Sequence, residues 1–214
     1  CKTLYDRSRD TVIVMEWRTM LGKNKCRIFV FVWGFFLFFP PYQGMAFKDG
    51  SITFYGARLT GDTLASTLEL SATYEDSYFL AAALSKKIGT LANYVDFEVE
   101  GQVVQHFIDQ HHQEFNVLIA GRWLPFPWDK HLDTSFAVGN GISYATKTPE
   151  IEAREHDETS QLLNYLMFEL AFAMPDAPQW NLVIRIHHRS GIFGLINDVE
   201  GASNAIGFGI RYKF

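Results

Sequence analysis

Cysteine is scarce in this 214-residue chain, which has only Cys1 and Cys26. Because no cysteine follows Cys26, the rest of the sequence forms neither a disulfide framework nor a thiolate metal site. Clusters of Lys and Arg are also missing, and the formal net charge is −5. Binding to the phosphate backbone of nucleic acid needs a basic surface, so we expect no nucleic-acid partner. After residue 47 no apolar stretch approaches the roughly 20 residues that a membrane-spanning helix needs.

The longest apolar run lies near the N-terminus. It covers residues 28–39 (I-F-V-F-V-W-G-F-F-L-F-F) and follows a basic segment at 23–27 (K-N-K-C-R). A basic segment, a short apolar run and small residues such as those at 44–46 are typical of a secretory signal peptide. We therefore interpret residues 20–46 as a signal peptide, with a retained N-terminal anchor as the alternative. Residues 1–19 are interpreted as a spurious or unstructured extension.

Beyond residue 47, short segments alternate apolar and polar residues with a period of two, which predicts β-strands. Eight segments show this pattern: 51–59, 77–86, 90–101, 114–124, 134–145, 162–173, 179–190 and 203–214. Four long polar connections separate them: 60–76, 102–113, 146–161 and 191–202. Long loops at one end and short turns at the other are typical of outer-membrane barrels. We predict an all-β protein, an eight-stranded antiparallel β-barrel over residues 47–214, in the bacterial outer membrane.

The two faces of each predicted strand differ in chemistry. In the third strand Phe97 and Val99 share one face, and Glu98 and Glu100 share the other. A soluble lipocalin-like barrel would turn the apolar face inward, whereas a membrane barrel turns it outward. The predicted signal peptide and the aromatic residues near strand ends favour a membrane barrel. Charges of both signs, which can pair inside a narrow lumen, favour it too. These charged residues are Asp96, Glu98, Glu100, Arg122, Glu169, Arg185 and Arg211.

The strongest functional signal lies in residues 180–190 (W-N-L-V-I-R-I-H-H-R-S). His188 and Ser190 continue the apolar face of this strand, and residues i and i+2 of a strand can contact each other. A serine becomes a nucleophile when a neighbouring imidazole takes its proton, and a carboxylate can fix the tautomer of that imidazole. The pair therefore suggests chemistry at a lipid surface, or else two ordinary polar residues at the membrane interface.

The segment I-H-H-R-S at 186–190, then N-D-V-E at 197–200 and a closing strand, resembles the outer-membrane lipid A 3-O-deacylases (PagL-like). The resemblance is specific only over residues 185–214. It implies an active site on the lipid-facing wall that hydrolyses an acyl ester of lipid A without a cofactor. The catalytic roles it implies are His188 as general base, Ser190 as nucleophile and Glu200 as the acid that orients His188.

Two departures from this family's pattern concern the oxyanion site and the acid. Gly191 stands where the family usually has an asparagine after the serine. The backbone N–H of Gly191 would then be the oxyanion donor. The loop between His188 and Glu200 is shorter than is usual in the family, and Asp198 is a rival for the acid.

Lipid A, or the lipopolysaccharide that contains it, is the expected partner. Whether the barrel is a monomer or a homodimer is left open. The alternative function is that of a non-enzymatic barrel, structural or adhesive, whose long loops carry its activity.

Other polar groups have simpler interpretations. The ligand types His106, His111 and His112, with Asp109 and Glu114, raise the question of a metal site. Their irregular spacing in a presumed flexible loop is unfavourable, and we expect no metal there. His187 is expected to pack inside the lumen, and Arg189 to reach toward lipid phosphate. We expect a solvated loop at the acidic group Glu152, Glu155, His156, Asp157 and Glu158.

Overall fold

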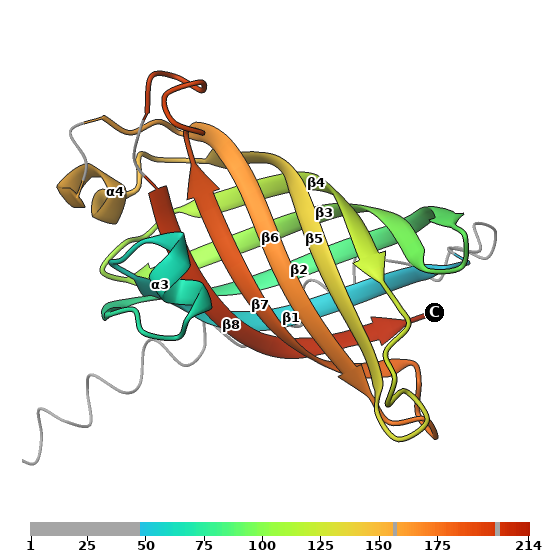
Figure 1. Cartoon of the computed structure of the whole chain (residues 1–214). Helices are drawn as coiled ribbons and strands as arrows, with labels where there is room; N and C mark the ends of the chain where they lie inside the picture. The colour runs from blue at the N-terminus through green and yellow to red at the C-terminus, as the bar shows by residue number, and fades with distance from the viewer. Residues whose placement is uncertain (1–47, 156–157, 200–201) are drawn as a thin grey trace, which may run out of the picture. The chain divides into compact units, whose positions relative to one another are not determined.

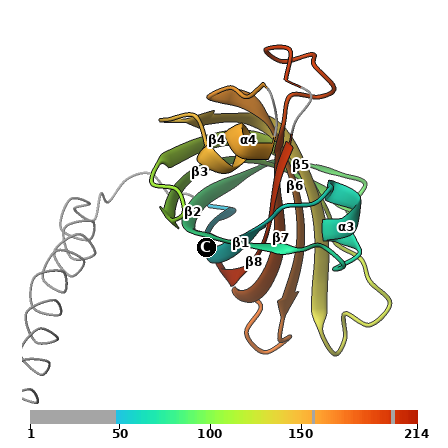
Figure 2. The same cartoon turned by 90° about the vertical axis from the view of Figure 1, so that its left-hand side faces the viewer.

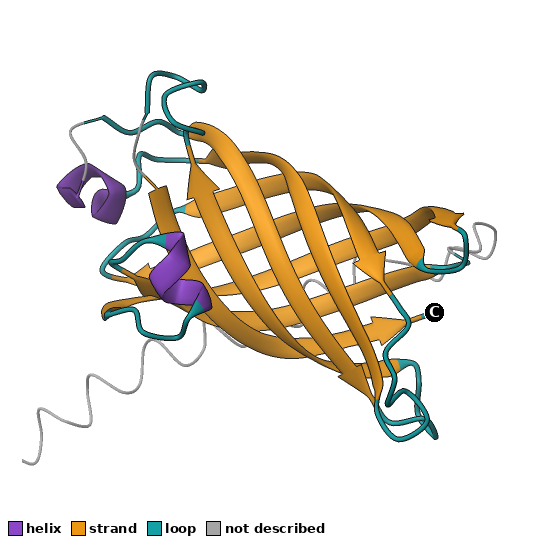
Figure 3. Cartoon of the chain, in the orientation of Figure 1, coloured by secondary structure: helices purple, strands orange, loops and turns teal. Residues whose placement is uncertain are grey.

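Eight antiparallel strands close into a barrel in the computed structural model, which describes residues 48–155, 158–199 and 202–214 (Figure 1, Figure 3). The strands are β1 (Gly50–Thr60), β2 (Tyr74–Leu91), β3 (Val95–Ile108), β4 (Gln113–Trp123), β5 (Asp133–Ala145), β6 (Leu162–Ala173), β7 (Trp180–Ser190) and β8 (Ala202–Lys213). Within these described residues two short helices, α3 (Leu64–Leu68) and α4 (Glu150–Glu155), lie in the connections. The predicted extension and signal peptide lie outside the described residues. None of the described helices is long and apolar enough to cross a membrane.

Each strand pairs with the next along the chain, and β1 pairs with β8. Closure gives the backbone groups of every strand a partner on both sides, which is the condition for strands to cross lipid. Both helices lie at the end of the barrel opposite the C-terminus, as Figure 1 shows. We call this the loop end; Figure 2 views the molecule from it. The other end, where the tight turns lie, is the turn end.

The outer wall is apolar and the lumen is polar. Leu182 and Phe208 on the wall are 58% and 59% exposed, whereas Glu169 and Arg185 inside are 0% exposed. A soluble barrel would show the reverse arrangement, because water would cover its outer wall. The soluble lipocalin-like alternative is therefore wrong, and the described barrel has the inside-out pattern of a membrane barrel.

Six charged side chains fill the middle of the lumen, and we call them the central charge cluster. They are Glu98, Glu100, Arg122, Glu169, Arg185 and Arg211. Arg185 lies 2.6 Å from Glu100 and also pairs with Glu169. Arg122 and Arg211 pair with Glu169 at 2.7 and 3.3 Å. Three permanent positive charges thus face three carboxylates, as the mixed signs predicted, and this compensation makes burial of the charges tolerable.

Two connections differ from their predictions. β2 continues to Leu91, so residues 90–91, predicted for the third strand, belong to β2 and the turn lies at residues 92–94. β3 continues to Ile108, which reduces the predicted loop over residues 102–113 to residues 109–112. The polar sequence of this segment suggested a loop, but its alternation continues. Val103 is 49% exposed on the wall, while Gln102 and His106 are buried in the lumen. In a membrane barrel a polar inward face is the rule, so polarity alone does not end a strand here.

Candidate functional site

β7 places His188 and Ser190 on the outer wall of the barrel. Their neighbours Arg185, His187 and Arg189 point into the lumen and are buried, because alternate residues of a strand face opposite sides. His188 is nevertheless only 9% exposed. The connection between β1 and β2 lies against β7 and β8 and carries α3 (Figure 1). The outward imidazole is therefore covered by a loop of the chain itself.

Hydrogen bonds hold this covering loop against the wall. Thr63 caps α3 by accepting from the backbone N–H of Ser66. One turn later the Thr67 hydroxyl lies 2.9 Å from the hydroxyl of Thr60, the last residue of β1. Both threonines are buried. A threonine pair thus fixes α3 beside the end of β1, next to the strand pair that carries His188.

Asn204 is the polar partner of His188. The two residues face each other across β7 and β8, and Nδ1 of His188 lies 2.7 Å from Oδ1 of Asn204. The Asn204 Nδ2 donates to the backbone oxygen of Asp62 at 2.7 Å, which fixes the orientation of the amide. Its oxygen therefore accepts from an Nδ1–H group, so Nε2 of His188 carries a lone pair. An imidazole in this tautomer can act as a general base through Nε2.

Ser190 shares the outward face and is half-buried. Within the described part of the chain, no hydrogen bond joins Ser190 to His188. Asp198 is exposed and does not bond to His188 either. Glu200 lies outside the described residues. The structure thus brings His188 together with Asn204, a residue that sequence reasoning missed, although Asn204 continues the outward face of Ile206 at a spacing of two.

Gly191 follows Ser190 at a point of close backbone approach. A Cβ on this residue would lie 1.9 Å from the backbone oxygen of Val199. The carbonyl of Gly191 also accepts from the N–H of Ile196, which closes a turn within the long connection between β7 and β8. Any larger residue would push this connection open, so packing alone accounts for glycine at this position.

An apolar hollow of about 530 Å³ opens on the outer wall beside this site. Its lining includes Gly56, Arg58, Tyr78, Leu80, Ile206 and Phe208. Ile206 lies two residues after Asn204 on the same face of β8. Arg58 packs over the Tyr74 and Tyr78 rings, each centroid 5.4 Å away, and pairs with Asp76 at 3.0 Å. The hollow therefore combines an apolar wall with one arginine, whose charge is paired with Asp76 at the surface.

A second polar group, which we call the outer histidine cluster, lies in the lumen toward the loop end. It consists of His106, His112, Glu114 and His187, all buried. The ring of His112 stacks on that of His106 with centroids 4.2 Å apart. Nε2 of His106 lies 3.3 Å from Glu114 Oε2, and Nε2 of His187 lies 2.9 Å from Glu114 Oε1. Burial and the neighbouring His106 lower the pKa of His112 to about 4, so this imidazole is neutral near pH 7.

Arg189 and Glu152 form a buried pair between the lumen and the connection from β5 to β6. Arg189 Nη1 lies 2.6 Å from Glu152 Oε2, and Arg189 also donates to the backbone oxygens of Ser160 and Gln161. Two predictions are therefore wrong. Arg189 does not reach toward lipid phosphate, and Glu152 of the acidic loop is buried at 3% exposure. Their mutual neutralisation explains both positions.

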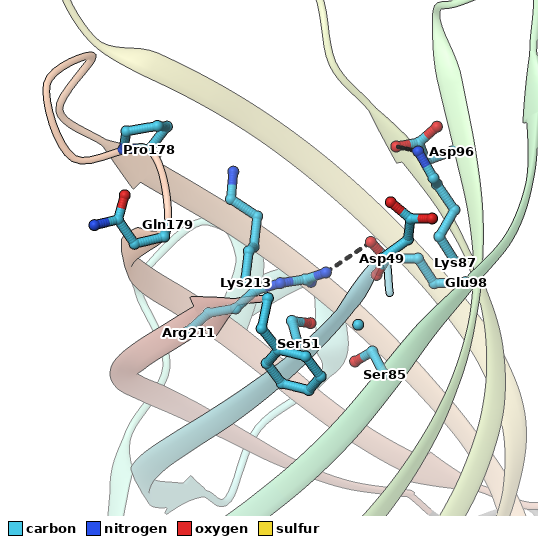
Figure 4. Close-up of a pocket in the computed structure, with 12 residues that line it drawn as sticks. Asp49, Ser51, Ser85, Lys87, Asp96, Glu98, Pro178, Gln179, Arg211 and Lys213 are labelled. Carbon is cyan, nitrogen blue, oxygen red and sulfur yellow. Dashed lines mark hydrogen bonds and ion pairs between the residues drawn. The ribbon is translucent and has the colours of Figure 1, made fainter. Parts of the chain in front are cut away.

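A polar vestibule of about 380 Å³ opens at the turn end (Figure 4). Lys87, Asp96 and Lys213 lie along it, and Arg211 pairs with Glu98 at 2.6 Å. Lys87 pairs with Asp96 at 3.6 Å. The vestibule thus ends on members of the central charge cluster and lies at the opposite end from His188.

Comparison with known proteins gives a fold and no family. The sequence matches no protein-family model and no curated protein. Among solved structures, the outer membrane enzyme PagL matches with a TM-score of 0.53 and 10% identity, over 76% of this chain and 99% of PagL. Neisserial surface protein A matches with a TM-score of 0.48 and 11% identity, over 78% and 98%. The barrel domain of Pseudomonas aeruginosa OprF gives 0.46 and 10%, over 78% and 98%.

At 10% identity the similarity to PagL establishes the eight-stranded barrel fold and nothing finer. Together with the apolar outer wall and the charged lumen, it decides the class. The chain is an outer-membrane β-barrel.

Proposed function

We propose that this outer-membrane barrel is a serine esterase that hydrolyses an acyl ester of lipid A. The observation that carries the proposal is the state of His188. It lies on the lipid-facing wall, and its bond to Asn204 leaves Nε2 able to accept a proton. Ser190, on the same face of β7, is the proposed nucleophile. A base and a hydroxyl at the bilayer surface suit a substrate that is itself a membrane lipid.

In the proposed reaction the hydroxyl oxygen of Ser190 attacks the ester carbonyl carbon while Nε2 of His188 takes the hydroxyl proton. His188 then gives that proton to the departing alkoxide oxygen, and water releases the acyl chain from Ser190 in a second round. The backbone N–H of Gly191 is the proposed oxyanion donor. The orienting partner of His188 in the structure is Asn204, so Glu200 or Asp198 would have to replace Asn204 at Nδ1 to act as the acid.

The hollow beside Ile206 supports a lipid as substrate. An acyl chain fits its apolar lining, and Arg58 at its edge supplies a positive charge for an anionic headgroup. The loop that carries α3 covers His188, so in the proposed enzyme this loop moves aside when lipid enters. Enzymes commonly complete a catalytic hydrogen bond only in the substrate complex, which fits a Ser190 that is not yet bonded to His188.

The test measures fatty-acid release from purified lipopolysaccharide by the folded wild-type barrel and its variants. Ser190→Ala and His188→Ala are each expected to lower the rate at least about 1000-fold, as loss of a nucleophile or its base does. His111→Ala, an exposed histidine of a neighbouring loop, is the matched control and should leave the rate unchanged. Equal rates in all four proteins, or no release by the wild type, would reject the proposal.

A second pair of variants separates the candidates for the orienting role. If Asn204 holds the tautomer, Asn204→Ala should slow release by about 100-fold, within the range that acid–base positioning contributes. Glu200→Ala should then have a small effect. The reverse result would assign the role to Glu200, as the resemblance to the lipid A deacylases implies.

The alternative function, adhesion through the loops, is favoured by one observation. Phe193 and Leu195 in the connection between β7 and β8 are 95% and 82% exposed. Apolar side chains displayed on an outer loop suit contact with another surface. Mass spectrometry of lipid A from cells with and without the protein separates the two functions, because adhesion leaves lipid A unchanged.

A further inference from the structure

Three members of the outer histidine cluster bring metal-ligating groups from two strands and the turn between them. His106 comes from the end of β3, His112 from the turn, and Glu114 from the start of β4. One ligand atom from each lies within 4.8 Å of the others. The expectation of no metal assumed that these residues lie in a flexible loop. Because β3 extends to Ile108, His106 and Glu114 instead lie inside the barrel wall on adjacent strands.

Several polar atoms in this cluster and beside it have no hydrogen-bond partner among the described residues. They are Nε2 of His112, Oε1 of Glu114 and Oε1 of Gln110, and all three are buried. His187 lies 2.9 Å from Glu114 Oε1, but outside the direction that a hydrogen bond requires. Buried polar atoms without partners are rare, and each is costly. Two of these atoms, His112 Nε2 and Glu114 Oε1, belong to groups that lie together and can each offer a lone pair, which indicates a missing positive species.

The charge balance of the lumen also indicates a missing positive charge beside Glu114. The central charge cluster is neutral, and Glu152 is balanced by Arg189. Glu114 is 2% exposed, and in the described part of the chain it pairs with no lysine or arginine. A buried carboxylate without a compensating charge is strongly destabilising. Its charge must be balanced either by protons on the surrounding histidines or by a cation.

We propose that His106, His112 and Glu114 bind a Zn²⁺ ion at the loop end of the lumen. Two imidazoles and one carboxylate are a known zinc ligand set, with water as the fourth ligand. The cluster lines a cavity of about 10 Å³, on the order of the space one water molecule needs. The three ligand atoms already lie within 4.8 Å of one another, so small side-chain movements would bring them to the spacing of zinc ligands.

Neighbouring side chains hold the ligands in orientation. Gln110 lies 3.4 Å from Nδ1 of His106, and a half-turn of its amide brings the unpartnered Oε1 there to accept from Nδ1–H. Nε2 of His106 is then free for the metal. Tyr55 lies 3.3 Å from Nδ1 of His187, whose Nε2 faces Glu114. Metal-ligating groups commonly have such outer hydrogen bonds, which fix the tautomer and the ring position.

The experiment titrates Zn²⁺ into the full chain, folded in detergent and freed of metal with a chelator. The protein carries no histidine tag, and Cys1 and Cys26 are alkylated so that thiols do not contribute. Calorimetry should show one Zn²⁺ per barrel. Co²⁺ as a second probe should give the visible absorption of a tetrahedral site. These readouts need no enzymatic activity, so they succeed or fail independently of the esterase proposal.

Single substitutions give the decisive comparison. His112→Ala lies outside the strands and should keep the barrel folded while lowering Zn²⁺ affinity about 100-fold or more. Glu114→Gln should do the same and abolish the Co²⁺ spectrum. His111→Ala, which removes an exposed histidine one residue away, should change affinity by less than about threefold, since it removes no ligand. No binding by the wild type, or equal affinity in His111→Ala and His112→Ala, would overturn the proposal in favour of a protonated histidine.

Discussion

The central charge cluster and the outer histidine cluster occupy the same lumen and are equally buried, but they balance charge in different ways. In the middle, three arginines that are positive at any physiological pH face three glutamates. Toward the loop end, one glutamate faces three histidines and, among the described residues, no lysine or arginine. The central charge cluster therefore stabilises the barrel at any physiological pH. The contribution of the outer histidine cluster to stability depends on whether protons or a metal ion bind to it.

The largest loss of stability is expected when a member of the central charge cluster is removed. Arg185→Ala removes the arginine partner of Glu100 and one of three arginines around Glu169. Removing one partner of a buried ion pair typically costs about 3–5 kcal/mol, because the other charge stays buried without compensation. The free energy of unfolding of the refolded barrel in detergent, measured by denaturant titration, should fall by this amount.

Two controls show whether burial causes this cost. Arg58→Ala breaks an ion pair with Asp76 at the surface, and such pairs contribute about 1 kcal/mol or less. The double variant Arg185→Met with Glu100→Gln should recover much of the lost stability, because it removes both charges. If Arg58→Ala lowered the free energy of unfolding as much as Arg185→Ala, burial would not be the cause of the cost.

Zn²⁺ should raise the stability of the barrel through the outer histidine cluster and not through the central charge cluster. If Zn²⁺ binds only the folded barrel, a free concentration 100-fold above its dissociation constant stabilises the fold by about 2.7 kcal/mol. Denaturant titrations with and without Zn²⁺ measure this difference. The zinc effect should vanish in His112→Ala and persist in Arg185→Ala. Stabilisation that survives in His112→Ala would place the ion elsewhere.

A smaller effect is expected at the Arg189–Glu152 pair, which anchors the connection between β5 and β6. Glu152→Gln keeps the shape of the side chain but leaves Arg189 with neutral acceptors, including Ser143. We expect a loss of about 2 kcal/mol, typical of a buried hydrogen bond to a charged group. Protease cleavage within residues 146–161 should also become faster. Glu150→Gln, an exposed glutamate of the same helix, should change neither quantity.

The fold was largely predictable from sequence because alternation encodes which face of a strand is buried. Phe97 and Val99 lie on the wall and Glu98 and Glu100 in the lumen, as their period of two indicates. The pairing of opposite charges also follows, since a closed lumen leaves them few other partners. These inferences depend on local pattern and on strand number, and both are present in the sequence.

The contacts of the two sites were not predictable in this way. His106 was assigned to a loop because its polar segment has the composition of one, although it belongs to the inward face of β3. Glu152 is buried only because Arg189, distant in sequence, extends to meet it. Asn204 becomes the partner of His188 only through the register between β7 and β8. Each contact depends on pairing across the barrel, which alternation within one strand does not encode.

The central charge cluster also limits the paths by which a ligand can reach this protein. Arg185 and Glu169 are fully buried in the middle of the lumen, so a solute that enters the vestibule cannot pass beyond them. In the described part of the lumen these side chains prevent solutes from passing along the barrel axis. A ligand of the loop-end sites must therefore approach sideways through the bilayer or from the medium above the loops.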